Sequence, residues 1–173
     1  MKYFVMLWLL ICGCDEFQMH VYETIEYPGQ APGKYRVLVG DYSKDVWIRN
    51  TDATHIRGTV RIKNGAYLRI EGGSVLYGEY ETDGKLVIED GSFCIGSGTY
   101  ETPIRFTSNQ VKNPHVGDWE GIVLSGLTRM ENIIVEYADV GVTVNHKLVR
   151  IYNGFFHMNK VECEGIKETV WRR

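Results

Sequence analysis

The chain has 173 residues, of which 44% are hydrophobic and 24% charged, and its formal net charge is −3. This length suits one domain with a continuous core. Lysine and arginine are scattered along the chain rather than gathered into a basic stripe, which disfavours a nucleic-acid-binding groove. The 19 glycines and 11 tyrosines favour short strands that are joined by tight turns.

The first residues have the pattern of an export signal. Residues 3–11 carry no charge, and this run is too short to cross the ~30 Å hydrocarbon core of a bilayer. The series LICGC at residues 10–14 resembles a bacterial lipobox, which ends in the cysteine that becomes lipidated. We therefore expect residues 1–13 to be a signal peptide and Cys14 to carry a lipid anchor. The alternatives are an ordinary secretory signal and an uncleaved hydrophobic tail.

Residues 14–45 lack the regular spacing that follows them. They contain two Pro-Gly dipeptides and alternating tyrosine, valine and leucine, a pattern typical of one or two strands with loops. We predict a tether that leads from the lipid to an N-terminal cap. A solenoid needs such a cap to shield its first coil.

A short segment of the chain then occurs twice. LRIEGGSVLYG at residues 68–78 returns as LVIEDGSFCIG at residues 86–96, eighteen positions later. Apolar residues at i and i+2 continue at this spacing, and both side chains of such a pair point to one face of a short strand. This periodicity predicts a solenoid whose coils stack about 4.8 Å apart and bury ladders of equivalent pairs. The main series is Leu68/Ile70, Leu86/Ile88, Ile104/Phe106 and Ile122/Leu124. A second series expected to point inward is Val60/Ile62, Val75/Tyr77 and Phe93/Ile95.

The motifs of this region resemble those of right-handed parallel β-helix repeat proteins of bacterial and archaeal surfaces. The most specific are PIRFTS at residues 103–108 and GDWEGI at residues 117–122, which accompany the run of residues 58–78 and ENIIVEYADVGV at residues 131–142. The resemblance implies an all-β chain with a right-handed parallel β-helix of about six short coils over residues 46–173. A left-handed β-helix, the alternative, would need an aliphatic-glycine hexapeptide rhythm that is absent here.

Five residues are candidates for ligand binding. An exposed Trp119 ring could stack on a sugar while the carboxylates of Asp118 and Glu120 accept hydrogen bonds from its hydroxyls. The preferred interpretation is that residues 117–121 form the re-entry turn of a long loop, with Trp119 folded over the coil. Tyr80 and Tyr100 lie in predicted loops after glycines and are candidates for exposed rings.

No catalytic or metal-ligating set is evident. The five histidines show no metal-ligand spacing with each other or with cysteine. Glu71 and Glu89 follow inward isoleucines, so we expect them to point outward and stack as an acidic ladder. Together with Asp83 and Asp90 they could bind Ca²⁺, the one conceivable cofactor. The preferred interpretation is that neighbouring basic side chains neutralise the charge of these carboxylates.

Cys94 and Cys163 are predicted to be unpaired. About three coils separate them, which amounts to roughly 14 Å of axial rise, whereas a disulfide needs Cα atoms within about 7 Å.

These features predict a lipid-anchored protein of the cell envelope that acts as a structural or glycan-binding module. The expected partners are the membrane, a polysaccharide or another envelope protein, and a second copy through an open C-terminal coil. The alternative is a carbohydrate-active enzyme, a polysaccharide lyase or glycoside hydrolase that uses outward-facing acidic residues. The fold cannot decide between them, because β-helices host lyases, hydrolases, adhesins and inert stalks alike.

Overall fold

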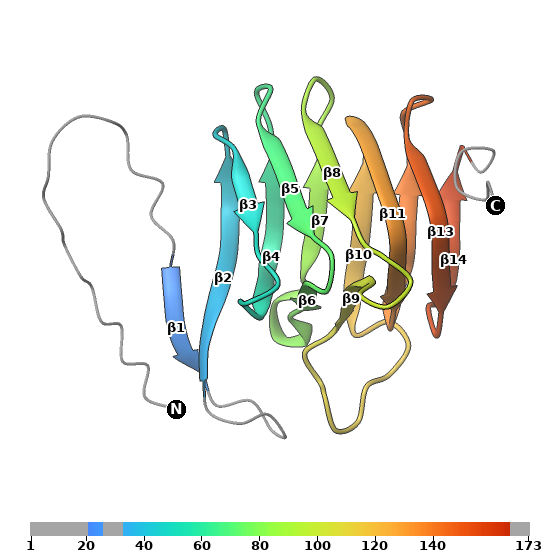
Figure 1. The fold of residues 1–173 in the computed structure, drawn as a ribbon. Helices are drawn as coiled ribbons and strands as arrows, with labels where there is room; N and C mark the ends of the chain where they lie inside the picture. Colours follow the sequence, from blue (N-terminus) through green and yellow to red (C-terminus); the bar gives the residue numbers. More distant parts are fainter. Residues whose placement is uncertain (1–20, 26–32, 167–173) are drawn as a thin grey trace, which may run out of the picture.

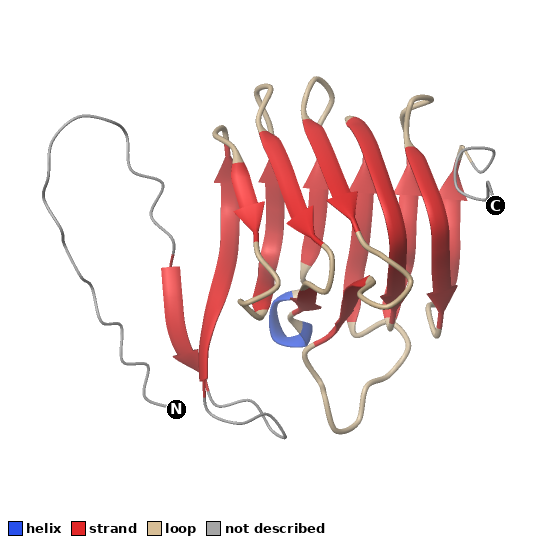
Figure 2. Ribbon diagram, in the orientation of Figure 1, coloured by secondary structure: helices blue, strands red, loops and turns tan. Residues whose placement is uncertain are grey.

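The computed structural model describes residues 21–25 and 33–166, which form a hydrogen-bonded sheet of fourteen strands and one short 3-10 helix, η1 (Tyr80–Thr82) (Figures 1 and 2). Within these residues no helix is long and apolar enough to cross a membrane. The predicted signal peptide and Cys14 lie outside the described residues. The strands are β1 (Val21–Ile25), β2 (Gly33–Tyr42), β3 (Val46–Ile48), β4 (Thr54–Ile62), β5 (Tyr67–Glu71), β6 (Val75–Gly78), β7 (Lys85–Ile88), β8 (Phe93–Ser97), β9 (Ile104–Ser108), β10 (Trp119–Leu124), β11 (Leu127–Glu136), β12 (Ala138–Val144), β13 (Arg150–His157) and β14 (Val161–Gly165).

The strands wind into a right-handed parallel β-helix with three faces, which confirms the predicted fold class. Face A is formed by β2, β4, β7, β10, β12 and β14. Face B is formed by β3, β5, β8, β11 and β13, and it lies in front of face A in Figure 1. Face C is formed by the first parts of β2 and β4, by β6 and β9, and by the last parts of β11 and β13.

The strand pair at the N-terminal end of the sheet is antiparallel. β1 pairs antiparallel with β2, whereas β2 pairs in parallel with β4. The parallel winding therefore begins at β2, inside the segment that the sequence pattern assigns to the tether and cap.

The interior is filled by ladders of equivalent apolar side chains. On face A, Val60, Leu86, Ile122 and Val142 follow one another in register, and each is at most 1% exposed. Their numbers differ by 26, 36 and 20 residues, so the coils vary in length and the expected coil of eighteen residues is wrong. Most of the variation lies in the connections between strands, and the register shifts only locally, between Gly121 and Ile122 and between Val39 and Asp41.

The repeated segment encodes a corner rather than a coil. Residues 68–78 run from β5 on face B to β6 on face C, whereas residues 86–96 run from β7 on face A to β8 on face B. Each turn is closed in the same way, by the amide of Ser74 or Ser92 donating to the carbonyl of the glutamate three residues earlier, at 3.2 and 3.0 Å. Glycine precedes each serine with a φ of 83° or 76°, which a side-chain-bearing residue rarely adopts.

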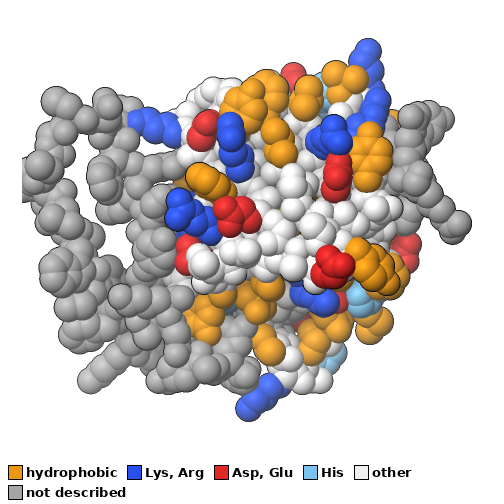
Figure 3. Space-filling view, viewed as in Figure 1, with side chains coloured by type: hydrophobic (Ala, Val, Ile, Leu, Met, Phe, Trp, Pro, Cys, Tyr) orange, Lys and Arg blue, Asp and Glu red, His pale blue; other side chains and the backbone are white. Residues whose placement is uncertain are grey.

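These corners also set which side chains point inward. Ser74 and Ser92 are fully buried, so the next inward positions are Leu76 and Cys94. The expected inward direction of Val75/Tyr77 and Phe93/Ile95 is therefore wrong, and Ile95 is 41% exposed. Val60/Ile62 does point inward, as predicted. The outward positions of face B carry hydrophobic, basic and acidic side chains side by side (Figure 3).

The two cysteines in the described residues, Cys94 and Cys163, are free, as predicted. Cys94 lies in β8 on face B and Cys163 in β14 on face A, and both side chains are buried.

Candidate functional site

Trp119 lies in the core. Its side chain is 1% exposed, and its indole Nε1 donates a 2.9 Å hydrogen bond to the carbonyl oxygen of Glu136. The ring occupies space left by Gly78, where an added Cβ would lie 2.4 Å from the indole. The expectation of a solvent-exposed ring is therefore corrected, because glycine on the neighbouring face opens room for the indole inside the coil.

The carboxylates beside Trp119 have separate partners. Asp118 is 5% exposed and accepts hydrogen bonds from the hydroxyl of Ser108 at 2.6 Å and the amide of His115 at 2.9 Å. These bonds close the loop of residues 109–118. Glu120 stays at the surface and forms an ion pair with Lys85 on the neighbouring strand of face A. The structure thus does not bring Asp118, Trp119 and Glu120 together at one exposed surface.

Tyr80 and Tyr100 are exposed and flank face C. Tyr80 follows β6 and is 54% exposed, and Tyr100 precedes β9 and is 94% exposed. The two rings lie at opposite corners of face C, so both remain candidates for contact with an extended ligand.

Polar and aromatic side chains that the sequence analysis did not identify form a row on the outward side of face C, where His55, Thr107 and Glu136 are buried and Tyr77 and His157 are partly exposed. His55, Tyr77 and Thr107 follow one another in register on β4, β6 and β9, and Glu136 pairs with His157 across β11 and β13. The rings of His55 and Tyr77 stack at 5.0 Å. The alternation of apolar and polar residues in these strands is the signal that could have found the row, once the inward positions were assigned correctly.

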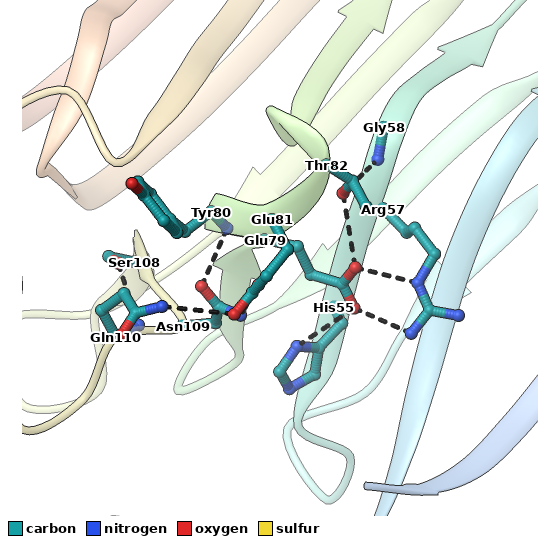
Figure 4. A network of polar contacts seen from close by, with 10 residues as sticks. All are labelled: His55, Arg57, Gly58, Glu79, Tyr80, Glu81, Thr82, Ser108, Asn109 and Gln110. Carbon is teal, nitrogen blue, oxygen red and sulfur yellow. Dashed lines mark hydrogen bonds and ion pairs between the residues drawn. The ribbon is translucent and has the colours of Figure 1, made fainter. Parts of the chain in front are cut away.

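At one end of this row, a buried carboxylate binds an arginine. Glu79 is 3% exposed, and its two carboxylate oxygens accept hydrogen bonds from Arg57 Nε at 2.8 Å and Arg57 Nη2 at 3.0 Å (Figure 4). His55 Nδ1 lies 3.8 Å from the same carboxylate. Burial, and then the charge of Arg57, lower the pKa of His55 to about 3, so this ring is neutral at physiological pH.

Further polar contacts join η1 to the loop that follows β9. The amide of Tyr80 donates to Asn109 Oδ1 at 2.9 Å, and Asn109 Nδ2 donates to Glu81 at 2.9 Å (Figure 4). Thr82 bridges Glu79 and the amide of Gly58, at 3.4 and 2.9 Å. These bonds fix the corner between faces C and A and hold the backbone that presents the Tyr80 ring.

At the other end of the row, a second buried carboxylate holds two more exposed groups. Glu136 is 5% exposed, and its oxygens lie 2.6 Å from Arg105 Nη1 and 2.9 Å from His157 Nε2. The side chains of Arg105 and His157 remain 42% and 37% exposed. A guanidinium carries five N–H donors, so Arg105 keeps donors for a ligand after it has bound Glu136. We call Arg105, Glu136 and His157 the face C cluster.

Tyr77 lies beside this cluster. Burial raises the pKa of its hydroxyl, nearby Tyr35 adds to that effect, and the positive charge of Arg105 opposes it. A neutral phenol, an imidazole and a guanidinium thus share one strip of the surface, and all three can form hydrogen bonds with hydroxyl or carboxylate groups.

The predicted acidic ladder does not form. Glu71 ends β5 on face B and accepts a 3.3 Å hydrogen bond from the amide of Asn50. Glu89 follows β7 on face A and lies 3.7 Å from Arg61. The two carboxylates lie on different faces because the eighteen-residue repeat spans one corner rather than one coil. Across the residues that the structure describes, no group of three or more His, Cys, Asp and Glu side chains could hold a metal ion.

A family model described as a pectate-lyase-like β-helix domain matches residues 40–145. The chain belongs to this pectate-lyase-like β-helix family. The match confirms the resemblance to parallel β-helix repeat proteins, and it includes Arg105 and Glu136 of the face C cluster while ending before His157. No curated protein and no solved structure matches the chain.

Proposed function

We propose that this β-helix module binds a polysaccharide along the outer surface of face C. The observation that carries the proposal is the face C cluster, in which buried Glu136 holds Arg105 and His157 with part of each side chain exposed. Sugar hydroxyls and carboxylates are hydrogen-bonding groups, and donors that are already held in place lose little entropy when they bind a ligand.

Aromatic rings along the same face support this proposal. Tyr77 lies between the two carboxylate clusters, and Tyr80 and Tyr100 flank the face at its two corners. Tyrosine offers a flat apolar ring with a polar end, which suits sugar rings that have one apolar and one polar side. The parallel strands also repeat at about 4.8 Å, so a ligand that lies along the axis meets a regular surface.

Binding without turnover is favoured over catalysis by the burial and the partners of the two carboxylates. Glycoside hydrolysis needs one protonated acid and one carboxylate, both in reach of the scissile bond. Glu79 and Glu136 are each buried and bound to an arginine, so neither presents an open carboxyl group to a scissile bond. The alternative, a polysaccharide lyase or glycoside hydrolase, is supported by the family likeness alone, and fold likeness is a weak guide to activity.

The test is a panel of neutral and acidic polysaccharides, offered with and without Ca²⁺ to the full chain. Arg105→Ala should weaken binding by roughly ten- to hundredfold, because a charged hydrogen bond contributes about 1.5–3 kcal/mol. Arg129→Ala is the matched control, since Arg129 also pairs with a glutamate at 2.6 Å but lies on face B. Thermal unfolding of both variants identifies any loss that comes from reduced stability.

Three results would overturn the proposal. Equal losses in the Arg105 and Arg129 variants would remove face C as the binding surface, and so would the absence of binding to every polysaccharide. New reducing ends or unsaturated uronates would show that the protein is a carbohydrate-active enzyme instead of a binding module.

We further propose that the protein is exported and held at the cell envelope by a lipid on Cys14. The support is the lipobox-like series at residues 10–14. Acyl chains contribute about 0.8 kcal/mol per buried CH₂, so two or three chains anchor a protein stably. Fractionation and palmitate labelling of the wild type and of Cys14→Ala test this. Label that persists in the variant, or a wild type found wholly in the soluble fraction, would contradict the anchor.

A further inference from the structure

The outer surface of face B differs from that of face C. One outward row, next to the corner with face A, consists of Tyr67, Phe93 and Leu127 in register on β5, β8 and β11. The adjacent row crosses all five strands and consists of Trp47, Arg69, Ile95, Arg129 and Arg150. We call these two rows the face B surface.

Several apolar side chains of this surface are open to solvent. Trp47 is 52% exposed, Ile95 is 41% exposed and Leu127 is 40% exposed. Single exposed apolar side chains are common, but these three lie on one sheet around the stacked rings of Tyr67 and Phe93, and such a group marks a surface that contacts something apolar. The five strands make this group about 19 Å wide at their spacing of about 4.8 Å.

Arginines are interleaved with the aromatic rings. The guanidinium of Arg69 lies 5.8 Å from the ring centre of Tyr67, and that of Arg129 lies 5.6 Å from the ring centre of Tyr152. Such contacts hold the guanidinium near the ring while its N–H groups can still bind an anion.

The positive charge of this surface is only partly neutralised. Arg129 pairs with Glu131, whereas no carboxylate in the described part of the chain forms an ion pair with Arg69 or Arg150. Glu71 and Glu131 lie in the next row, toward the corner with face C. Arginine and apolar side chains therefore gather on one side of a chain whose net charge is −3.

We propose that the face B surface docks on an anionic lipid membrane. Tryptophan and tyrosine favour the level of the headgroups, aliphatic side chains favour the acyl boundary, and arginine pairs with lipid phosphates. A glycan packs its apolar side on flat aromatic rings, whereas the branched aliphatic side chains of Ile95 and Leu127 suit acyl chains better. A second copy laid face to face would bring one arginine row against another, and like charges in close contact repel.

This proposal uses residues that take no part in the glycan proposal. Face B and face C are different sides of the coil, so a protein that docks through face B keeps face C free to bind a ligand. It is also independent of a lipid on Cys14, because the test below removes that residue.

The experiment measures which face meets the bilayer. The full chain carries Cys12→Ser and Cys14→Ser, so that the remaining thiols, Cys94 and Cys163, are buried. A spin label is attached at Ile95→Cys on face B or, as the control, at Thr143→Cys, which faces outward on β12 of face A. Vesicles contain phosphatidylcholine alone or phosphatidylcholine with phosphatidylglycerol, and accessibility to oxygen and to a water-soluble nickel chelate is recorded.

With anionic vesicles, we expect the label at residue 95 to gain oxygen accessibility and lose nickel accessibility, while the label at residue 143 stays open to nickel. The change should disappear with phosphatidylcholine alone and in the variant Arg69→Glu/Arg150→Glu, and it should persist in Arg61→Glu, which alters a face A arginine. Circular dichroism checks that each variant is folded.

Four outcomes would overturn the proposal. They are no change at residue 95, equal changes at both labels, an unchanged signal in the Arg69→Glu/Arg150→Glu variant, and loss of accessibility to both relaxants at residue 95. The last outcome would indicate a protein partner, such as a second copy, instead of lipid.

Discussion

Replacing Trp119 by alanine tests whether this residue belongs to the core. The side chain is 1% exposed, it packs against Gly78, and its indole donates a 2.9 Å hydrogen bond to the carbonyl of Glu136. Removing a buried tryptophan side chain costs about 3–5 kcal/mol, because packing is lost and a cavity remains. That is a large share of the roughly 5–15 kcal/mol that stabilises a typical domain.

A second substitution separates the ring from its hydrogen bond. Trp119→Phe keeps most of the apolar contact but leaves the carbonyl of Glu136 without the indole donor, a loss of about 1–3 kcal/mol. Trp47→Ala is the matched control, because Trp47 is 52% exposed on face B, and it should cost less than about 1 kcal/mol.

Equilibrium unfolding in urea, followed by far-ultraviolet circular dichroism, measures all three variants. The order of destabilisation should be Trp119→Ala, then Trp119→Phe, then Trp47→Ala. If Trp119→Ala costs no more than Trp47→Ala, or if it weakens glycan binding without a change in stability, the assignment of Trp119 to the core is wrong.

Three further predictions follow from single residues. Burial lowers the pKa of His55 to about 3, so between about pH 6.5 and pH 3 this histidine is protonated in the unfolded chain and neutral in the folded chain. The free energy of unfolding should therefore decrease as the pH falls through this range, and His55→Phe should reduce the pH dependence of Tm. Burial raises the pKa of Cys94 to about 12, so in a Cys12→Ser/Cys14→Ser chain an aromatic disulfide reagent should detect two thiols in urea and Cys94 should not react in the folded state; rapid reaction without urea would contradict the buried position. Gly121→Ala should prevent folding, because φ is +108° and the new Cβ would lie 1.7 Å from the carbonyl of Val140, whereas Gly91→Ala, with nothing within 4 Å, should cost only about 1–2 kcal/mol by thermal unfolding.

The fold class could be predicted from the sequence because apolar ladders are a local signal. Leu86 and Ile88 point inward as their i, i+2 spacing requires, and the same holds for Ile122 and Leu124. The coil length could not be obtained in this way. The same type of turn is built around Ser74 and around Ser92, but at two different corners. Similar sequence segments therefore do not mark equivalent positions in successive coils.

The face C cluster was missed for a related reason. Arg105 and Glu136 are 31 residues apart, and they meet only because β9 and β11 are neighbours in the coil. The register between strands depends on the lengths of the connecting loops, which the apolar pattern does not encode. Trp119 was misplaced because the space it fills is provided by Gly78, on a strand whose relation to β10 only the folded coil reveals.

Because coil length varies, each coil is a unit that can be added without changing the coils next to it. The segment from Val60 to Lys85 leads from one face A position to the next, since Leu86 stacks directly on Val60. A second copy of residues 60–85 inserted before Leu86 would add one strand to every face and lengthen the molecule by about 4.8 Å. The residues on either side of the insertion would stay the same while the distance between them grows. The number of coils would therefore set the length that the protein spans.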